Sequence, residues 1–266
     1  MHETRPSALA TSETPGHWLL AKLGKRVLRP GGMELTRKLM RALDVGPNDD
    51  VVEFAPGLGV TAKLTIARGP ASYTAVERDP QAANIVRRQL VGAAQQCVIG
   101  TAEDTGLNDE AYDVVYGEAM LSMQPPDSKI AIVREAYRLL KLAGRYGIHE
   151  LCLTPDDIDD KTRKEISKQM AMAIRHGAQL LTTSGWKELL TSQGFVIGDS
   201  ATAPMHLLEP RRMISDEGLL GTLRFARNLL MDREARQRVR AMRGVFRKFG
   251  RNLSAIMLVG VKAEQP

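Results

Sequence analysis

An apolar run that ends in a carboxylate and passes directly into a glycine-containing turn is the feature that most constrains this chain. Residues 51–54 read Val-Val-Glu-Phe, and residues 55–59 read Ala-Pro-Gly-Leu-Gly. A helical pattern begins at Val60, and a second apolar run over residues 72–77 ends in Glu77. A strand, a turn, a helix and another strand in this order are typical of a parallel α/β sheet. The pattern therefore predicts a ligand site at the carboxyl ends of these strands.

The glycines alone do not identify the ligand. Residues 57–62 satisfy the dinucleotide pattern G-x-G-x-x-G/A, and Glu77 lies near the spacing expected for a ribose-binding acid. Glu53 argues for a different cofactor, because its carboxylate would repel a pyrophosphate bound at the N-terminus of the following helix. Two unit charges about 4 Å apart repel by about 4 kcal/mol at an effective dielectric constant of about 20. S-adenosylmethionine carries no phosphate and has two cationic groups that a carboxylate attracts, so it is the expected cofactor.

The chain resembles the class I S-adenosylmethionine-dependent methyltransferases, over about residues 31–195 and the last predicted strand. In that family the first strand and turn usually follow the pattern hydrophobic-hydrophobic-Asp-hydrophobic-Gly-x-Gly-x-Gly. This pattern aligns with Glu53, Ala55, Gly57 and Gly59. Glu53 replaces the usual Asp, and Ala55 replaces the first Gly, so the backbone at Ala55 has to accept a Cβ atom.

Later segments carry the same resemblance. Residues 100–104 read Gly-Thr-Ala-Glu-Asp and match the family's G-D-A-E-D-like segment, with Thr101 in the place of the usual adenine-facing Asp. The resemblance therefore implies that either the Thr101 hydroxyl or Glu103 meets the adenine amino group. The next predicted strand runs into Gly117 and Glu118, where the family's backbone passes the methionyl part of the cofactor.

The resemblance assigns the two strand-end acids to the cofactor. It implies that Glu77 hydrogen-bonds the ribose hydroxyls and that Glu53 contacts the methionyl end, directly or through water. A structural cap on the helix that begins at Val60 is the alternative for Glu53. The complete set of expected cofactor-binding residues is Glu53, Ala55, Pro56, Gly57, Gly59, Glu77, Arg78, Thr101, Ala102, Glu103, Gly117 and Glu118.

The expected chemistry makes few demands on the protein. Methyl transfer from a sulfonium is an in-line displacement, so the protein mainly aligns the nucleophile, the methyl carbon and the sulfur, and sometimes removes a proton. Glu118 and His149 are the expected catalytic residues, because they follow strands at the edge where α/β sheets place their ligands. A histidine satisfied at the end of the sheet is the alternative for His149. Cys97 and Cys152 lack metal-ligand spacing, and no metal is expected.

The order of the predicted elements indicates one α/β domain over residues 1–266. The expected fold is Rossmann-like, with a seven-stranded, mostly parallel sheet and helices on both faces, and the resemblance adds that the last strand is antiparallel. Strands are predicted at residues 51–54, 72–77, 96–100 and 112–116, in a fifth run ending at 149–150, in a sixth beginning at 195, and at 253–261. Residues 1–16 are expected to form a flexible tail. By the resemblance, residues 17–45 form a helical lid, in which His17 is a packing residue.

Residues 209–250 are predicted to form a basic helical insertion between the last two strands. From Glu209 to Arg251 there are twelve Lys or Arg against five acids, whereas the whole chain has a net charge of +6. The spacing of five arginines places them on one helical face; they are Arg233, Arg236, Arg240, Arg243 and Arg247. By the resemblance, the insertion lies on the rim where acceptors enter. The arginine face is either only solvated or a contact for an anionic small substrate, an acidic lipid surface or RNA.

The expected function is S-adenosylmethionine-dependent methylation of a small-molecule acceptor, with anionic acceptors among the candidates. Methylation of RNA or another polyanion is the main alternative, weakened by an aromatic content of only 5%. A dinucleotide-dependent oxidoreductase and a non-catalytic cofactor-binding protein are further alternatives, and no DNA partner is expected. The chain shows no signal-peptide pattern and no apolar stretch long enough to span a bilayer, which predicts a cytoplasmic protein. The acceptor and the oligomeric state stay open at this point.

Overall fold

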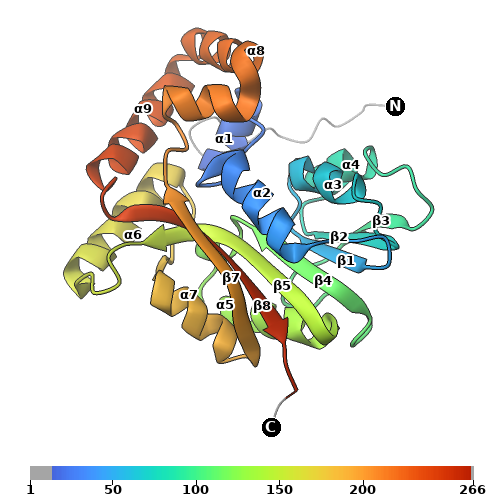
Figure 1. The fold of residues 1–266 in the computed structure, drawn as a ribbon. Coiled ribbons are helices and arrows are strands. Elements are labelled where there is room, and N and C mark those ends of the chain that lie inside the picture. The colour runs from blue at the N-terminus through green and yellow to red at the C-terminus, as the bar shows by residue number, and fades with distance from the viewer. Residues whose placement is uncertain (1–13, 265–266) are drawn as a thin grey trace, which may run out of the picture.

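Figure 1 shows a computed structural model of the protein, which describes residues 14–264. Its sheet contains β1 (Asp50–Phe54), β2 (Ser72–Glu77), β3 (Gln95–Ile99), β4 (Tyr112–Glu118), β5 (Leu140–Leu153), β6 (Leu181–Thr182), β7 (Phe195–Pro204) and β8 (Leu253–Lys262). The strand order is β3-β2-β1-β4-β5-β8-β7, and the two-residue β6 pairs with the end of β5. The first five strands are parallel, and β8 runs antiparallel to both β5 and β7. The predicted fold class is confirmed, with β6 as an additional short strand.

The strand order places a ligand crevice at β1 and β4. From β1 the chain adds strands on one side, through β2 to β3, and then returns to add β4 and β5 on the other side. The connections that leave the carboxyl ends of β1 and β4 therefore diverge, and open α/β sheets bind ligands at such a switch point. The two acids predicted to bind the cofactor end β2 and nearly end β1.

Helices cover both faces of the sheet. They are α1 (Gly16–Lys22), α2 (Gly32–Leu43), α3 (Val60–Ile66), α4 (Pro80–Arg87), α5 (Pro126–Leu139), α6 (Asp160–Ile174), α7 (Thr183–Thr191), α8 (Pro210–Met231) and α9 (Arg233–Lys248). Neighbouring residues of a strand point to opposite faces, so Val51 packs with α2, α3 and α4, whereas Val52 packs with α5 and α7. The central strands β1 and β4 are mostly apolar along the residues that both layers of helices cover.

A helical layer lies beyond the carboxyl ends of the strands. It is formed by α1, α6, α8 and α9, which share a core that includes Leu19, Ile166, Phe225 and Met242 (Figure 1). The insertion predicted at residues 209–250 thus packs against the N-terminal helix and α6. The tail expected at residues 1–16 lies outside the described residues up to residue 13, and Gly16 already begins α1.

The N-terminal lid, predicted over residues 17–45, consists of two helices joined by a non-helical segment. After α1 ends at Lys22, Gly24 adopts a φ of 102°, and the chain leaves the helix. The following segment is then fixed by α8, because the buried Glu217 carboxylate accepts the backbone N–H groups of Arg26 and Val27 at 2.9 and 2.8 Å. Lys25 is buried beside the same carboxylate, 3.6 Å from it. The insertion therefore holds the lid in place through the Glu217 side chain of α8.

Candidate cofactor and acceptor site

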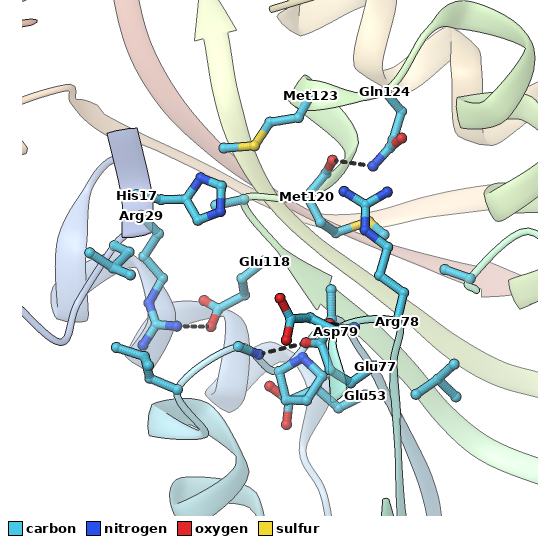
Figure 2. A pocket seen from close by; sticks show the side chains of 18 of the residues that line it. His17, Arg29, Glu53, Glu77, Arg78, Asp79, Glu118, Met120, Met123 and Gln124 are labelled. Atoms are coloured by element: carbon cyan, nitrogen blue, oxygen red, sulfur yellow. Dashed lines mark hydrogen bonds and ion pairs between the residues drawn. The ribbon is translucent and has the colours of Figure 1, made fainter. Parts of the chain in front are cut away.

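A pocket opens at the carboxyl ends of β1, β2 and β4 (Figure 2). Ten of the twelve residues predicted to bind the cofactor line it: Glu53, Ala55, Pro56, Gly57, Glu77, Arg78, Thr101, Ala102, Glu103 and Glu118. Gly59 and Gly117 do not line the pocket, and neither does His149. Most of the residues predicted to bind the cofactor thus lie around one pocket, and their binding of the cofactor stays a prediction.

The turn between β1 and α3 depends on left-handed backbone conformations. Ala55 has a φ of 51°, in a region that glycine occupies more easily, so the Ala that replaces the family's first Gly is accepted with some strain. Gly59 caps α3 with a φ of 69°, and a Cβ atom there would lie 2.5 Å from the Gln89 side chain. Gln89 in turn donates to the carbonyl oxygen of Leu58 at 3.0 Å. Gly59 therefore shapes the turn, and it does not itself line the pocket.

Glu77 is held in a defined orientation at the end of β2. Its side chain accepts the backbone N–H of Gly57 at 3.1 Å and that of Asp79 at 3.0 Å, one on each carboxylate oxygen. Each oxygen can still accept a further hydrogen bond. A buried, pre-oriented carboxylate with two spare acceptor positions suits a pair of neighbouring hydroxyl groups, as in a ribose.

Glu53 is buried and bonded to the hydroxyl groups of two tyrosines. The hydroxyl of Tyr116 donates to its Oε2 atom at 2.8 Å, and the hydroxyl of Tyr73 donates to the same atom. Burial outweighs these two hydrogen bonds and raises the pKa of Glu53 to about 7. A cationic group bound beside it would favour the charged form. The geometry does not favour the alternative role for Glu53, because the side-chain hydrogen bonds that it makes in the described part of the chain come from Tyr73 and Tyr116 and not from backbone N–H groups of α3.

The raised pKa of Glu53 predicts a pH-dependent stability difference. An acid whose pKa is higher in the folded state than its ordinary value of 4.5 makes a contribution to stability that is lost as the pH rises toward and through about 7. The glutamine of Glu53→Gln does not titrate, so the variant does not lose this contribution. The free energy of unfolding of the unliganded variant, relative to that of wild type, should therefore be about 2 kcal/mol more favourable at pH 8 than at pH 5. Urea unfolding of both proteins at the two pH values measures the gain. A constant difference would show that Glu53 is already charged at pH 5.

Glu118 occupies a different environment, although it also lines the pocket. Its carboxylate accepts from the Thr36 hydroxyl at 2.7 Å, from the Thr61 hydroxyl, and from Arg29 Nη1 at 2.8 Å. Burial by itself would raise the pKa of Glu118, but the Arg29 guanidinium and hydrogen bonds from His149 and Thr61 lower it to about 2. A carboxylate this acidic and this fully bonded is a poor general base, so the geometry does not favour the catalytic role predicted for Glu118.

The general-base role predicted for His149 is not favoured either. The imidazole is completely buried behind Glu118, with Nδ1 2.8 Å from Glu118 Oε1 and Nε2 2.5 Å from the carbonyl oxygen of Pro30. Both partners are hydrogen-bond acceptors of the protein, so each ring nitrogen is directed at the protein and neither is directed at a substrate. His149 is a positioning residue that joins β5 to the lid, which corresponds to the alternative of a histidine satisfied at the end of the sheet.

The far end of the pocket contains residues that the motifs did not predict. His17 and Trp18 of α1 lie there together with Met123, Gln124 and His176. Figure 2 shows His17, Met123 and Gln124 around this end of the pocket. The His17 ring lies 6.1 Å from that of His176. Burial and the neighbouring His176 and Arg78 lower the pKa of His17 to about 4, so this histidine is neutral at pH 7. No motif or periodicity marked His176, because only the return of the chain after α6 brings it to α1.

A buried acid fixes the loop at this end. The Glu150 carboxylate accepts the backbone N–H groups of Met120, Leu121 and Ser122 at 2.9, 2.8 and 3.0 Å. These bonds hold the short 3-10 turn (Leu121–Met123) after β4, which carries Met123 into the pocket. Among the residues that the structure describes, no cluster of His, Cys, Asp and Glu could hold a metal ion.

Fold and site together define a doubly wound α/β protein with a nucleoside-cofactor site. Comparison with known proteins extends this conclusion. A family model described as a methyltransferase domain matches residues 52–148. An uncharacterized protein of Haemophilus influenzae is 32% identical over 231 residues, which cover 85% of this chain and 90% of that protein. The chain belongs to the class I S-adenosylmethionine-dependent methyltransferases, and S-adenosylmethionine is its cofactor, as predicted.

More distant relatives share the fold. A phosphoethanolamine N-methyltransferase of Plasmodium falciparum is 21% identical over 174 residues, covering 63% of this chain and 65% of that protein. The crystal structure of a putative sarcosine dimethylglycine methyltransferase from Galdieria sulphuraria has a TM-score of 0.65 at 16% identity, with 87% of this chain and 84% of that one covered. Phosphoethanolamine N-methyltransferase 2 of Haemonchus contortus, in complex with S-adenosyl-L-methionine, has a TM-score of 0.69 at 13% identity over 94% of this chain and 57% of that one.

The described part of the chain contains no helix that is long and apolar enough to cross a membrane.

Proposed function

We propose that the protein methylates a small-molecule acceptor bound at the far end of the pocket. The observation that carries this proposal is the enclosure of that end by three separate segments. They are α1 with His17 and Trp18, the loop after β4 with Met123 and Gln124, and the turn after α6 with His176. A site closed over by side chains from three directions fits a small molecule better than a folded polymer.

Different residues of the pocket serve the cofactor and the acceptor. When bound, S-adenosylmethionine supplies a methyl group on a positively charged sulfur, and this sulfur is released as a neutral thioether. Glu77 is oriented for the ribose hydroxyls, and Glu53 offers a carboxylate for a cationic group. Glu118 and His149 fix the lid, so the acceptor meets a site that is already formed. His17, which is neutral at pH 7, has the protonation state needed to accept a hydrogen bond or a proton from an acceptor.

His176 is the residue of this end that most directly supports a polar acceptor. Its Nδ1 atom is buried and has no hydrogen-bond partner within residues 14–264. A buried polar atom without a partner costs free energy, and a turn of the ring that brings this nitrogen toward the pocket would let a bound polar group satisfy it. An acceptor with a hydroxyl, amine or carboxyl group could supply that partner.

The polyanion alternative receives less support. No residue of the basic insertion lines this pocket, contrary to the expectation that its arginine face borders the acceptor entrance. Two of the five arginines instead pair with Glu209, at 3.3 Å for Arg243 and 2.9 Å for Arg247. The insertion therefore acts on the site through the lid.

A methyl-acceptor screen tests the proposed function. The protein is incubated with S-adenosylmethionine labelled on its methyl group and with either a small-metabolite extract or total RNA. We expect label in the small-molecule fraction, and about ten-fold lower kcat/KM for His176→Ala because one polar contact is lost. His206→Ala, which changes an exposed histidine outside the pocket, is the matched control. Label confined to RNA would overturn the proposal.

A further inference from the structure

The outer half of α8 exposes an unusual number of large apolar side chains. Leu220, Leu223 and Met231 are 82%, 57% and 81% exposed, and Leu219 and Leu230 are exposed as well. Between residues 218 and 231 only Phe225 is buried in the shared helical core. Single exposed leucines are ordinary on protein surfaces, but a contiguous group on one helix marks an interaction site.

The arrangement of these residues is regular. Leu220, Leu223, Arg227 and Leu230 recur at the helical period and therefore share one face, and the exposed Arg224 lies beside them. Residues 218–231 contain no Asp or Glu. The outward face is thus both apolar and cationic, which is the composition of a helix that lies in the interface of a membrane.

The acids of α8 are kept away from this face by a break in the helix. Gly218, with a φ of 73° and a ψ of 171°, interrupts α8 directly after Asp216 and Glu217. Both acids point inward: Asp216 accepts the backbone N–H of Met33 at 3.0 Å, and Glu217 accepts those of Arg26 and Val27. The break separates an acidic inner turn that holds the lid from an outer helix without acids. In Figure 1, α8 lies at the outer end of the helical layer, away from the sheet.

We propose that the outer face of α8, formed by Leu219, Leu220, Leu223, Arg224, Arg227, Leu230 and Met231, docks the protein on the headgroup layer of an anionic lipid bilayer. The leucines enter the acyl boundary, while the two arginines pair with lipid phosphate groups. This surface is separate from the acceptor pocket, and the inference does not depend on the proposed acceptor.

Charge argues for lipid over a second copy of the chain. A two-fold contact through this face would bring Arg224 and Arg227 toward the same arginines of the other copy, with no acid within residues 218–231 to compensate them. Exposed Arg233 at the start of α9 and exposed Arg240 in its middle are further cations of the insertion, and the exposed Glu234 offsets only one of them. An anionic bilayer supplies the opposite charge and an apolar phase at once.

The test is sedimentation of the full chain with lipid vesicles at low and high salt. We expect binding to vesicles of phosphatidylcholine mixed with phosphatidylglycerol, little binding to phosphatidylcholine alone, and release by salt. Arg224→Gln with Arg227→Gln should weaken binding by about twenty-five-fold, since each basic residue near an anionic surface contributes about five-fold. Leu220→Ser with Leu223→Ser should also weaken binding to the anionic vesicles at low salt, although it leaves both arginines in place.

Matched variants keep the test specific. Val91→Ser with Val196→Ser changes two other exposed apolar residues, and Arg88→Gln with Arg134→Gln removes two other exposed arginines. These controls should bind vesicles like wild type, and S-adenosylmethionine affinity should be unchanged in every variant, which shows that each one folds. Absence of binding to the anionic vesicles at low salt, or equal loss in the controls, would overturn the proposal. So would a dimer in sedimentation velocity that the leucine variant converts to a monomer.

Discussion

Glu118→Gln is expected to destabilise the protein by about 3 kcal/mol at neutral pH. The carboxylate is almost completely buried, and its pKa is lowered from an ordinary value of 4.5 to about 2. That shift of about 2.5 pKa units corresponds to about 3 kcal/mol of stability in the charged form. A neutral amide leaves the Arg29 guanidinium buried without its counter-charge. Urea unfolding measures the loss.

The pH dependence of this effect has a defined sign. An acid with a depressed pKa contributes stability that is present above its ordinary pKa and is lost as the pH falls through the folded value. The difference between wild type and Glu118→Gln should therefore be full at pH 7 and shrink as the pH falls from 4.5 toward 2. Glu188→Gln, a change at an exposed glutamate of α7, should alter stability by less than about 0.5 kcal/mol. Equal stability of the Glu118 variant and wild type at pH 7 would contradict the ion-pair network.

Glu77→Ala is expected to weaken S-adenosylmethionine binding by about ten-fold or more. Hydrogen bonds to a charged group contribute about 1.5 to 3 kcal/mol each, and the variant can make none to the ribose hydroxyls. The same substitution frees the N–H groups of Gly57 and Asp79, which the carboxylate now orients. Titration calorimetry with S-adenosylmethionine measures the affinity, and a thermal melt verifies that the variant is folded.

A second substitution separates ligand contact from loop orientation. Glu77→Gln keeps an oxygen that can accept one of the two backbone N–H groups, but it loses the negative charge. We expect it to bind S-adenosylmethionine with an affinity between those of wild type and Glu77→Ala. Glu188→Ala serves as the control at a distant exposed position and should bind like wild type. Wild-type affinity in a folded Glu77→Ala protein would remove Glu77 from the cofactor site.

The order of strands and helices, and the cofactor end of the pocket, were predictable because they depend on local patterns. The mostly apolar runs at residues 51–54 and 112–116 predicted strands, since a strand buried on both faces needs no polar alternation. A parallel sheet brings the carboxyl ends of its strands to one edge, so residues that end β1 and β2, such as Glu53 and Glu77, had to meet. Periodicity and the direction of a strand can both be recognised from residues that are close together in the sequence.

The roles of Glu118 and His149 were decided by partners far away in the chain. Both residues follow strands at the expected edge, and both were therefore predicted to be catalytic. The partners that change this interpretation, Arg29, Pro30 and Thr36, come from the N-terminal segment, which α8 holds against the sheet. Nothing in the sequence around position 118 or 149 indicates that a guanidinium or a carbonyl oxygen from that segment lies within hydrogen-bonding distance.

Burial was the other property that only the tertiary structure decided. The apolar and basic spacing predicted helices for residues 209–250, but it did not separate the leucines that pack inward from those that stay in water. The break at Gly218 and the docking of Phe225 determine that Leu220 and Leu223 face outward. The same holds for the raised pKa of Glu53, which depends on the removal of water by the surrounding sheet and persists although hydrogen bonds from two tyrosines lower it. Local sequence patterns were enough to predict which residues end the strands. The charge and exposure of those residues depend on what the rest of the chain places around them, and no local pattern contains that information.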